Sequence, residues 1–129
     1  MPCSYAQQRL WFIDRWQPGT AAYNISVAMR LVGPLSAPAL ESALNQLVSR
    51  HESLRTAFAL QDGEPFQHIV TRVAVQMPLR DLSGRGPAQA QGEALDLAQE
   101  FAQRPFDLTV APLLRTLLIR IDAQEHLLV

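Results

Sequence analysis

The stretch Arg50-His51-Glu52-Ser53-Leu54-Arg55-Thr56-Ala57-Phe58 decides the fold of this 129-residue chain, because it joins a helix to a strand and holds the densest group of polar side chains. Cations at the end of a helix complement the partial negative charge of its last carbonyls. We therefore expect Arg50 and His51 to cap the helix that precedes them. We expect Arg55 to form an ion pair inside the fold. This structural interpretation is favoured over catalysis by these residues.

The segments on either side of this stretch have clear patterns. Before it, apolar residues recur at helical spacing after a good N-cap at Ser36, which predicts a helix with one face on a core. After it, alternation over Leu54–Leu60, the turn signal Asp62-Gly63 and a return over Phe66–Val70 predict a hairpin. The helical face is made of Leu40, Ala43, Leu44, Leu47 and Val48.

Farther out, the chain continues with the same mixture of helices and strands. A run over Leu113–Ile121 is apolar on both alternating faces, which predicts a central strand covered on two sides. The other expected elements are a helix capped by Ser4 and Gln7 and ended by Gln17-Pro18-Gly19, a strand over Tyr23–Leu31, a weak strand over Arg72–Leu79, a helix over Ala88–Gln103 and a strand from His126.

The order of these elements, α-β-α-β-β-β-α-β-β, sets the fold class. Hairpins in the middle of a helix–strand alternation favour an α+β fold. We expect a two-layer helix/sheet lobe over residues 1–129, with helices on one face of a mainly antiparallel or mixed sheet.

Composition narrows the function classes. Hydrophobic residues make up 48% and charged residues 18% of the chain, which permits a packed core. A net charge of −1, carried against eleven scattered arginines and no lysine, gives no electrostatic case for nucleic acid or a membrane surface. The single cysteine, Cys3, offers neither a disulfide nor metal spacing. We therefore expect no metal, no nucleic-acid or membrane partner, and a cytoplasmic location.

The residues taken alone name no catalytic group. The sequence has no glycine-rich phosphate loop, no metal cluster and no G-x-S-x-G elbow. His68 and His126 lie in expected strands or turns, where such histidines are more often surface or edge residues than catalysts. Glu52 has no paired carboxylate nearby in sequence.

Several segments together resemble the condensation domains of nonribosomal peptide synthetases. Ser4–Phe12 resembles the first core motif of this family and Arg50–Phe58 is similar to the second. The supporting segments are Tyr23-Asn24-Ile25, Gly33-Pro34-Leu35, Pro105-Phe106-Asp107-Leu108 and Pro112-Leu113-Leu114-Arg115. They match in order and spacing over nearly the whole chain.

The resemblance implies a fold like chloramphenicol acetyltransferase, in which two similar lobes enclose a tunnel. Residues 1–129 would be a partial domain, the N-terminal lobe, truncated before the family's His-His-x-x-x-Asp-Gly motif. The catalytic candidate of the family is the second histidine of that motif. We therefore expect no catalytic residue in this chain and no activity of the chain alone.

The resemblance also implies roles for seven residues. Arg50, His51, Glu52 and Arg55 would support the active site structurally, with Arg55 in a buried ion pair. Ser4, Gln7 and Arg9 would belong to an architectural motif on the tunnel side.

The implied reaction is amide formation between an acyl or peptidyl donor and an aminoacyl acceptor, both held as thioesters. No cofactor would bind directly, because the substrates arrive on the phosphopantetheine arms of carrier domains. The implied partners are those carrier domains and the second lobe. The context of Tyr23-Asn24-Ile25 and Gly33-Pro34-Leu35 is typical of domains that join two L-residues. The alternatives are a non-catalytic half-domain that binds a carrier protein or partner chain, and part of a stand-alone acyltransferase of the same superfamily.

Overall fold

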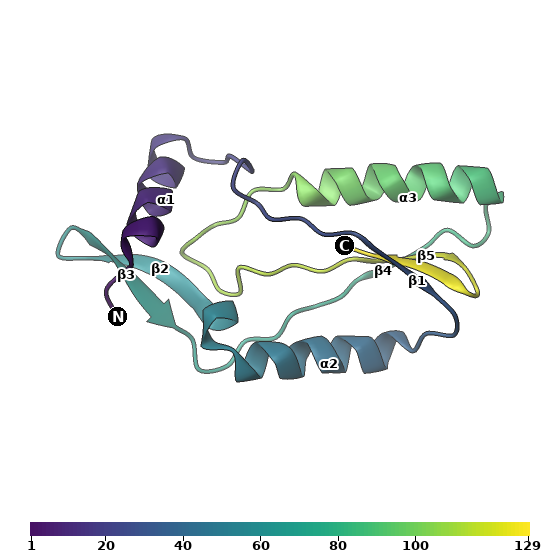
Figure 1. Ribbon diagram of the computed structural model, residues 1–129, viewed down its shortest axis with the longest axis horizontal. Coiled ribbons are helices and arrows are strands. Elements are labelled where there is room, and N and C mark those ends of the chain that lie inside the picture. Colours follow the sequence, from purple (N-terminus) through teal and green to yellow (C-terminus); the bar gives the residue numbers. More distant parts are fainter.

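A computed structural model describes all residues, 1–129, and its elements follow the predicted order, with one short 3₁₀ helix added. Figure 1 shows α1 and the β2–β3 hairpin at one end of the molecule and the four-stranded sheet toward the other. The elements are α1 (Tyr5–Trp16), β1 (Met29–Val32), α2 (Ala37–Arg50), η1 (Glu52–Arg55), β2 (Thr56–Gln61), β3 (Glu64–Ile69), β4 (Leu79–Asp81), α3 (Pro87–Ala102), β5 (Leu118–Asp122) and β6 (Glu125–Leu128).

The main sheet is mixed, as the sequence predicts. Its strand order is β1-β6-β5-β4, with β4 and β5 parallel and the other two pairings antiparallel. The β2–β3 hairpin forms a separate antiparallel pair. Asp62 and Gly63 both have positive φ, 53° and 84°, as a tight two-residue hairpin turn requires.

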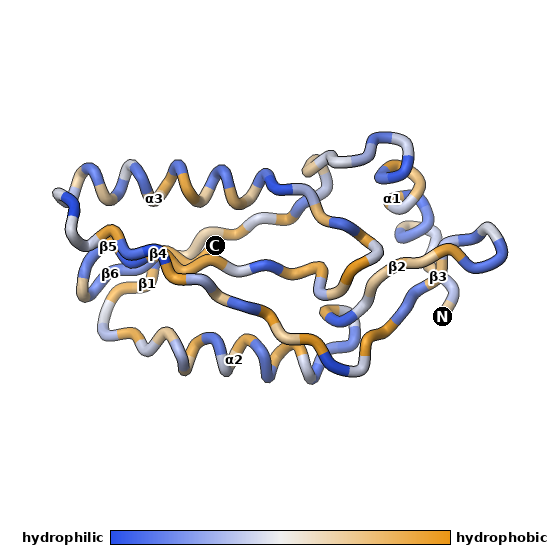
Figure 2. The backbone as a smooth tube through the Cα atoms, turned by 180° about the vertical axis from the view of Figure 1, so that it is seen from behind, coloured by the Kyte–Doolittle hydropathy of each residue, from blue (hydrophilic) through white to orange (hydrophobic).

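The two longer helices cover opposite faces of this sheet, which corrects the expectation of two layers to three (Figure 1). Figure 2 shows hydrophobic and hydrophilic residues alternating along both α2 and α3, as expected for helices with one buried face. Ala90, Ala94 and Ala98 of α3 pack with Ile119 of β5. On the other face, Leu40 and Leu44 of α2 pack with Leu118. Neighbouring residues of β5 therefore belong to two different cores, which confirms a strand covered on two sides.

Two expected strands are mostly unpaired segments outside the sheet. Of Tyr23–Leu31, only residues from Met29 onward join the sheet. Of Arg72–Leu79, only Leu79 does. The backbone of Val75 bonds instead to the side chain of Asn45 in α2, at 2.8 and 2.9 Å. Alternation thus predicted an extended backbone at these places, but strand pairing also needs a neighbour in the right position.

The length and hydropathy of the helices, taken together, fall short of those of a membrane-spanning helix. The longest, α3, has 16 residues, and none combines the length and apolar character that a membrane span requires.

Candidate functional site

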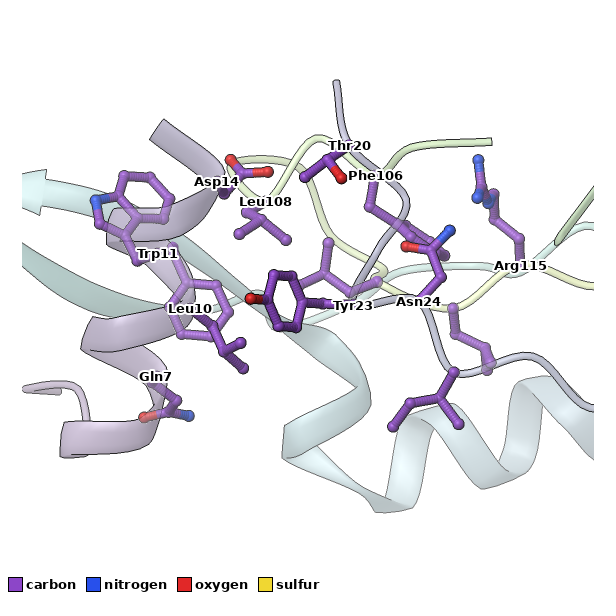
Figure 3. Close-up of a pocket in the computed structure, with 14 residues that line it drawn as sticks. Gln7, Leu10, Trp11, Asp14, Thr20, Tyr23, Asn24, Phe106, Leu108 and Arg115 are labelled. Atoms are coloured by element: carbon purple, nitrogen blue, oxygen red, sulfur yellow. The ribbon is translucent and has the colours of Figure 1, made fainter. Parts of the chain in front are cut away.

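An apolar groove of about 340 Å³ lies where α1 faces the segments that lead into and out of the sheet (Figure 3). Nine of its 14 lining residues are hydrophobic. The lining consists of Gln7, Leu10, Trp11, Asp14, Thr20, Tyr23, Asn24, Ile25, Phe58, Phe106, Leu108, Leu113, Leu114 and Arg115. We call this the groove.

The groove gathers side chains from five stretches of the chain, of which only the last two are close together in sequence. Trp11 comes from α1, Ile25 from the segment before β1, Phe58 from β2, Leu108 from the loop after α3, and Leu114 from the approach to β5. Trp11 is only 6% exposed, and its ring centroid lies 6.3 Å from that of Phe58. These contacts suit the binding of a long apolar or weakly polar chain rather than an ion.

A second hollow of about 250 Å³ adjoins the groove and runs toward the end of β6. The residues that line both hollows are Asn24, Ile25, Phe106, Leu114 and Arg115. Ile25 is 96% exposed, which is unusual for an isoleucine and marks an uncovered apolar surface along these hollows.

Polar groups at this shared wall hold the chain around the end of α3. The Asn24 amide donates to the carbonyls of Ala102 and Arg104, at 3.1 and 2.8 Å. Arg115 donates to the carbonyl of Pro105 at 3.2 Å and also to that of Arg104. Burial, with a smaller contribution from the nearby charge of Arg104, lowers the pKa of Arg115.

The family model described as "Condensation domain" matches residues 1–129, the whole chain. The chain belongs to the condensation domain family. Among its relatives, a linear gramicidin synthase from Brevibacillus parabrevis is 47% identical over 128 residues, and phosphinothricin tripeptide synthetase PhsC of Streptomyces viridochromogenes is 42% identical over 128 residues. Each match covers 99% of this chain, which spans 2% and 12% of the lengths of these two relatives.

Solved condensation domains have the same fold. The first condensation domain of the CDA synthetase superposes with a TM-score of 0.88 at 23% identity, over 98% of this chain and 33% of that one. The starter condensation domain of rhizomide synthetase RzmA gives a TM-score of 0.86 at 27% identity, over 97% and 30%. The expected family and the mixed helix-and-sheet fold of its N-terminal portion are thus confirmed, and the chain corresponds to about a third of a condensation domain.

The second core motif of this condensation domain lies largely outside the groove. Arg50 ends α2 and is exposed, as are His51 and Glu52. His51 caps the helix through its backbone N–H, which donates to Leu47 at 3.2 Å, rather than through its ring. Only Phe58, at the far end of the motif, reaches the groove lining.

Within residues 1–129, Arg55 bonds to backbone carbonyls rather than to an acid, and its expected ion pair stays a prediction. Its Nε donates to the carbonyl of Val48 at 3.2 Å, and another guanidinium nitrogen donates to that of Val70 at 2.5 Å. The carbonyl of Val48 belongs to the last turn of α2, where backbone acceptors lack helical donors. Arg55 therefore ties the end of α2 to the end of the β2–β3 hairpin.

The first core motif of the condensation domain forms both the start of α1 and part of the groove. Ser4 and Gln7 form the predicted capping box, with bonds of 3.3 and 2.8 Å. Gln7 lines the groove and donates to Gln67 of β3 at 3.2 Å. Arg9 lines shallow hollows elsewhere on α1 rather than the groove.

His126 differs from the expected surface position. It is buried, and its Nδ1 has no hydrogen-bond partner. Burial, aided by the charge of Arg120, lowers its pKa, while Asp122 and Asp81 act in the opposite direction. It lies in β6 and lines neither hollow. No group of three His, Cys, Asp or Glu side chains is arranged to hold a metal ion.

Proposed function

We propose that residues 1–129 are the N-terminal lobe of a condensation domain that forms amide bonds between carrier-bound thioesters. The acceptor amine nitrogen attacks the carbonyl carbon of the donor thioester, the C–S bond breaks, and the carrier thiol leaves with a proton. The observation that supports this is the convergence of five of the family-like segments on one apolar groove. A cytoplasmic location and a preference for two L-residues fit this role and stay predictions.

In this proposal the chain supplies binding rather than proton transfer. The groove would form one wall of the substrate tunnel, where Trp11, Phe58 and Leu108 exclude water from the acyl chain or the phosphopantetheine arm. No lining residue is a histidine or a cysteine, and the carboxylate of Asp14 has no paired acid in the lining. Residues 1–129 alone are therefore expected to bind an acyl or phosphopantetheine group without catalysing condensation.

Binding in the groove can be followed through Trp11. In a Trp16→Phe background, Trp11 is the one remaining tryptophan, because the sequence holds two. Titration with S-octanoyl-pantetheine is expected to change its fluorescence saturably. Ile25→Asp should weaken this binding roughly tenfold or more, since it places a charge in an apolar site. At 96% exposure, this substitution should leave folding intact.

The matched control is Val32→Asp. Val32 is 73% exposed and lies outside both hollows, so its substitution adds the same charge to a neighbouring exposed apolar position. It should leave the affinity unchanged. Equal binding by both variants, or no saturable binding by the parent chain, would contradict the role proposed for the groove.

The outer face of α1 supports carrier domains as partners. Tyr5, Arg9, Phe12 and Trp16 recur at i, i+4, i+7 and i+11, which places them on one helix face. Trp16 is 74% exposed, and its ring centroid lies 6.0 Å from that of Phe12. Arg9 forms no ion pair within the chain. Exposed aromatic side chains beside unpaired arginines suit an acidic protein partner, and we propose that an acidic carrier domain docks on this face.

Charge and aromatic substitutions test this docking surface. Titration with a purified, phosphopantetheinylated carrier domain of a nonribosomal peptide synthetase, followed by calorimetry, should give a Kd that rises with salt. Trp16→Ala should raise the Kd roughly tenfold, as loss of an aromatic interface residue commonly does. Arg9→Glu should raise it further, whereas Arg80→Glu, on the exposed strand β4, should not. Carrier binding that is insensitive to Trp16 and Arg9 would place the docking surface elsewhere.

A further inference from the structure

The carbonyls at the C-terminal end of α3 are held by two side chains from distant parts of the chain. Asn24 bonds the carbonyls of Ala102 and Arg104, which lie 78 and 80 residues away in sequence. Arg115 bonds the same Arg104 carbonyl and that of Pro105. One backbone oxygen, that of Arg104, thus accepts hydrogen bonds from both side chains. The Ala102 carbonyl is one of the acceptors that the end of a helix leaves free, whereas those of Arg104 and Pro105 lie just beyond α3.

The guanidinium of Arg115 is also stacked on aromatic rings. Its central carbon lies 3.9 Å from the ring centroid of Phe106 and 5.7 Å from that of Phe101. Arg115 forms no ion pair, and its Nε has no partner. Its charge is therefore compensated by backbone carbonyls just beyond the C-terminal end of α3 and by ring faces rather than by an acid.

These residues form the shared wall of the two hollows. Asn24, Phe106 and Arg115 line both of them. Figure 3 shows Asn24, Phe106 and Arg115 around the same part of the groove, with Tyr23 beside Asn24. Phe106 directly follows the carbonyls that Asn24 and Arg115 hold, so its backbone is fixed by one set of bonds and its ring by the stack.

We propose that Asn24 and Arg115 are positioning residues: together they clamp the Arg104 carbonyl and hold Phe106 in place as a wall of the groove. This inference rests on the proposed function, because it assigns the clamp a role in binding the acyl or pantetheine chain. The clamp acts through Phe106 and the 102–105 backbone. Removing either side chain releases the same turn, so the two substitutions should not have independent effects.

The test measures S-octanoyl-pantetheine affinity in the Trp16→Phe background, well below the unfolding temperature of each variant. Asn24→Ala and Arg115→Met should each weaken binding roughly fivefold to tenfold, the scale of one lost hydrogen bond to or from such a group. The double variant should be about as weak as the weaker single variant, rather than showing the product of both effects. Arg115→Lys should not rescue binding, because lysine keeps the charge but lacks the planar fork. Asn24→Asp provides a variant of nearly identical shape that lacks the donors.

Arg104→Met is the matched control. The Arg104 guanidinium lies over Phe101 at 5.6 Å, much as that of Arg115 does, but it pairs with Glu100 and lines neither hollow. It should keep wild-type affinity. An equal loss in Arg104→Met, full rescue by Arg115→Lys, or strictly multiplicative effects of the two clamp substitutions would overturn the proposal.

A second measurement needs no ligand. In protein with labelled phenylalanine rings, the NMR signals of Phe106 should shift in Asn24→Ala as well as in Arg115→Met, and stay in place in Arg104→Met. If the parent chain binds no thioester, the proposed function fails, while the ring signals still decide whether the clamp positions Phe106. Unmoved Phe106 signals in both clamp variants would refute the clamp even if the thioester binds.

Discussion

Replacing Leu118 by alanine is expected to lower the free energy of unfolding by about 2–5 kcal/mol, the range found for buried leucines. Leu118 is 0% exposed and lies in β5, the strand that pairs with both β4 and β6. It packs with Met77 and Leu128 beneath α2. The loss combines the transfer free energy of the removed isopropyl group with the cost of the cavity left behind. Urea unfolding followed by tryptophan fluorescence measures it.

Leu95→Ala is the control for this substitution, because it removes the same atoms from a leucine that is 65% exposed on α3. Its effect should stay within about 0.5 kcal/mol, as is usual for surface positions. Similar losses for Leu118 and Leu95 would mean that the core beneath α2 is not packed as described.

The second large effect is expected for Arg55→Ala. This substitution leaves the partly buried carbonyls of Val48 and Val70 without this donor, and a fully buried unsatisfied group would cost about 1–3 kcal/mol. We expect a total loss of about 2–4 kcal/mol on the same scale. In a complete condensation domain, the variant should fold poorly or lose activity.

A control variant and a change in salt concentration test whether the effect comes from lost bonds to backbone carbonyls or from a lost surface charge. Arg50→Ala removes an exposed arginine from the same motif and should cost little. Bonds to backbone carbonyls should keep their contribution at high salt better than an exposed ion pair would. Soluble expression of Arg55→Ala with unchanged turnover in a complete domain would contradict the prediction.

Local patterns in the sequence predicted most of the elements. The pair Asp62-Gly63 predicted the hairpin turn because few residues adopt positive φ easily. Apolar residues on both faces of Leu113–Ile121 predicted a covered strand, although only Leu118–Asp122 pairs. The alternation in Tyr23–Leu31 predicted too long a strand, since pairing depends on a neighbour that a local pattern does not contain.

The site was less accessible from the sequence than the fold. The resemblance placed Asn24 and Arg115 in family-like segments without giving them a role, because their shared acceptor lies about 80 residues from one and about 11 from the other. The only local signals were an amide and a guanidinium inside apolar stretches. Arg55 also shows what the sequence missed: its bonds to the carbonyls of Val48 and Val70 join segments that no local pattern connects.

The arrangement of β5 has a mechanical consequence. Leu118 and Ile119 are consecutive along the chain, yet one belongs to the core under α2 and the other to the core under α3. The two cores thus share strand β5, and loss of packing in one should disturb the other. A bulky or polar substitution in this part of β5 should weaken the packing of both α2 and α3. A substitution on the outer face of either helix should affect that helix alone. Packing on both faces of the sheet therefore depends on the same two residues, Leu118 and Ile119.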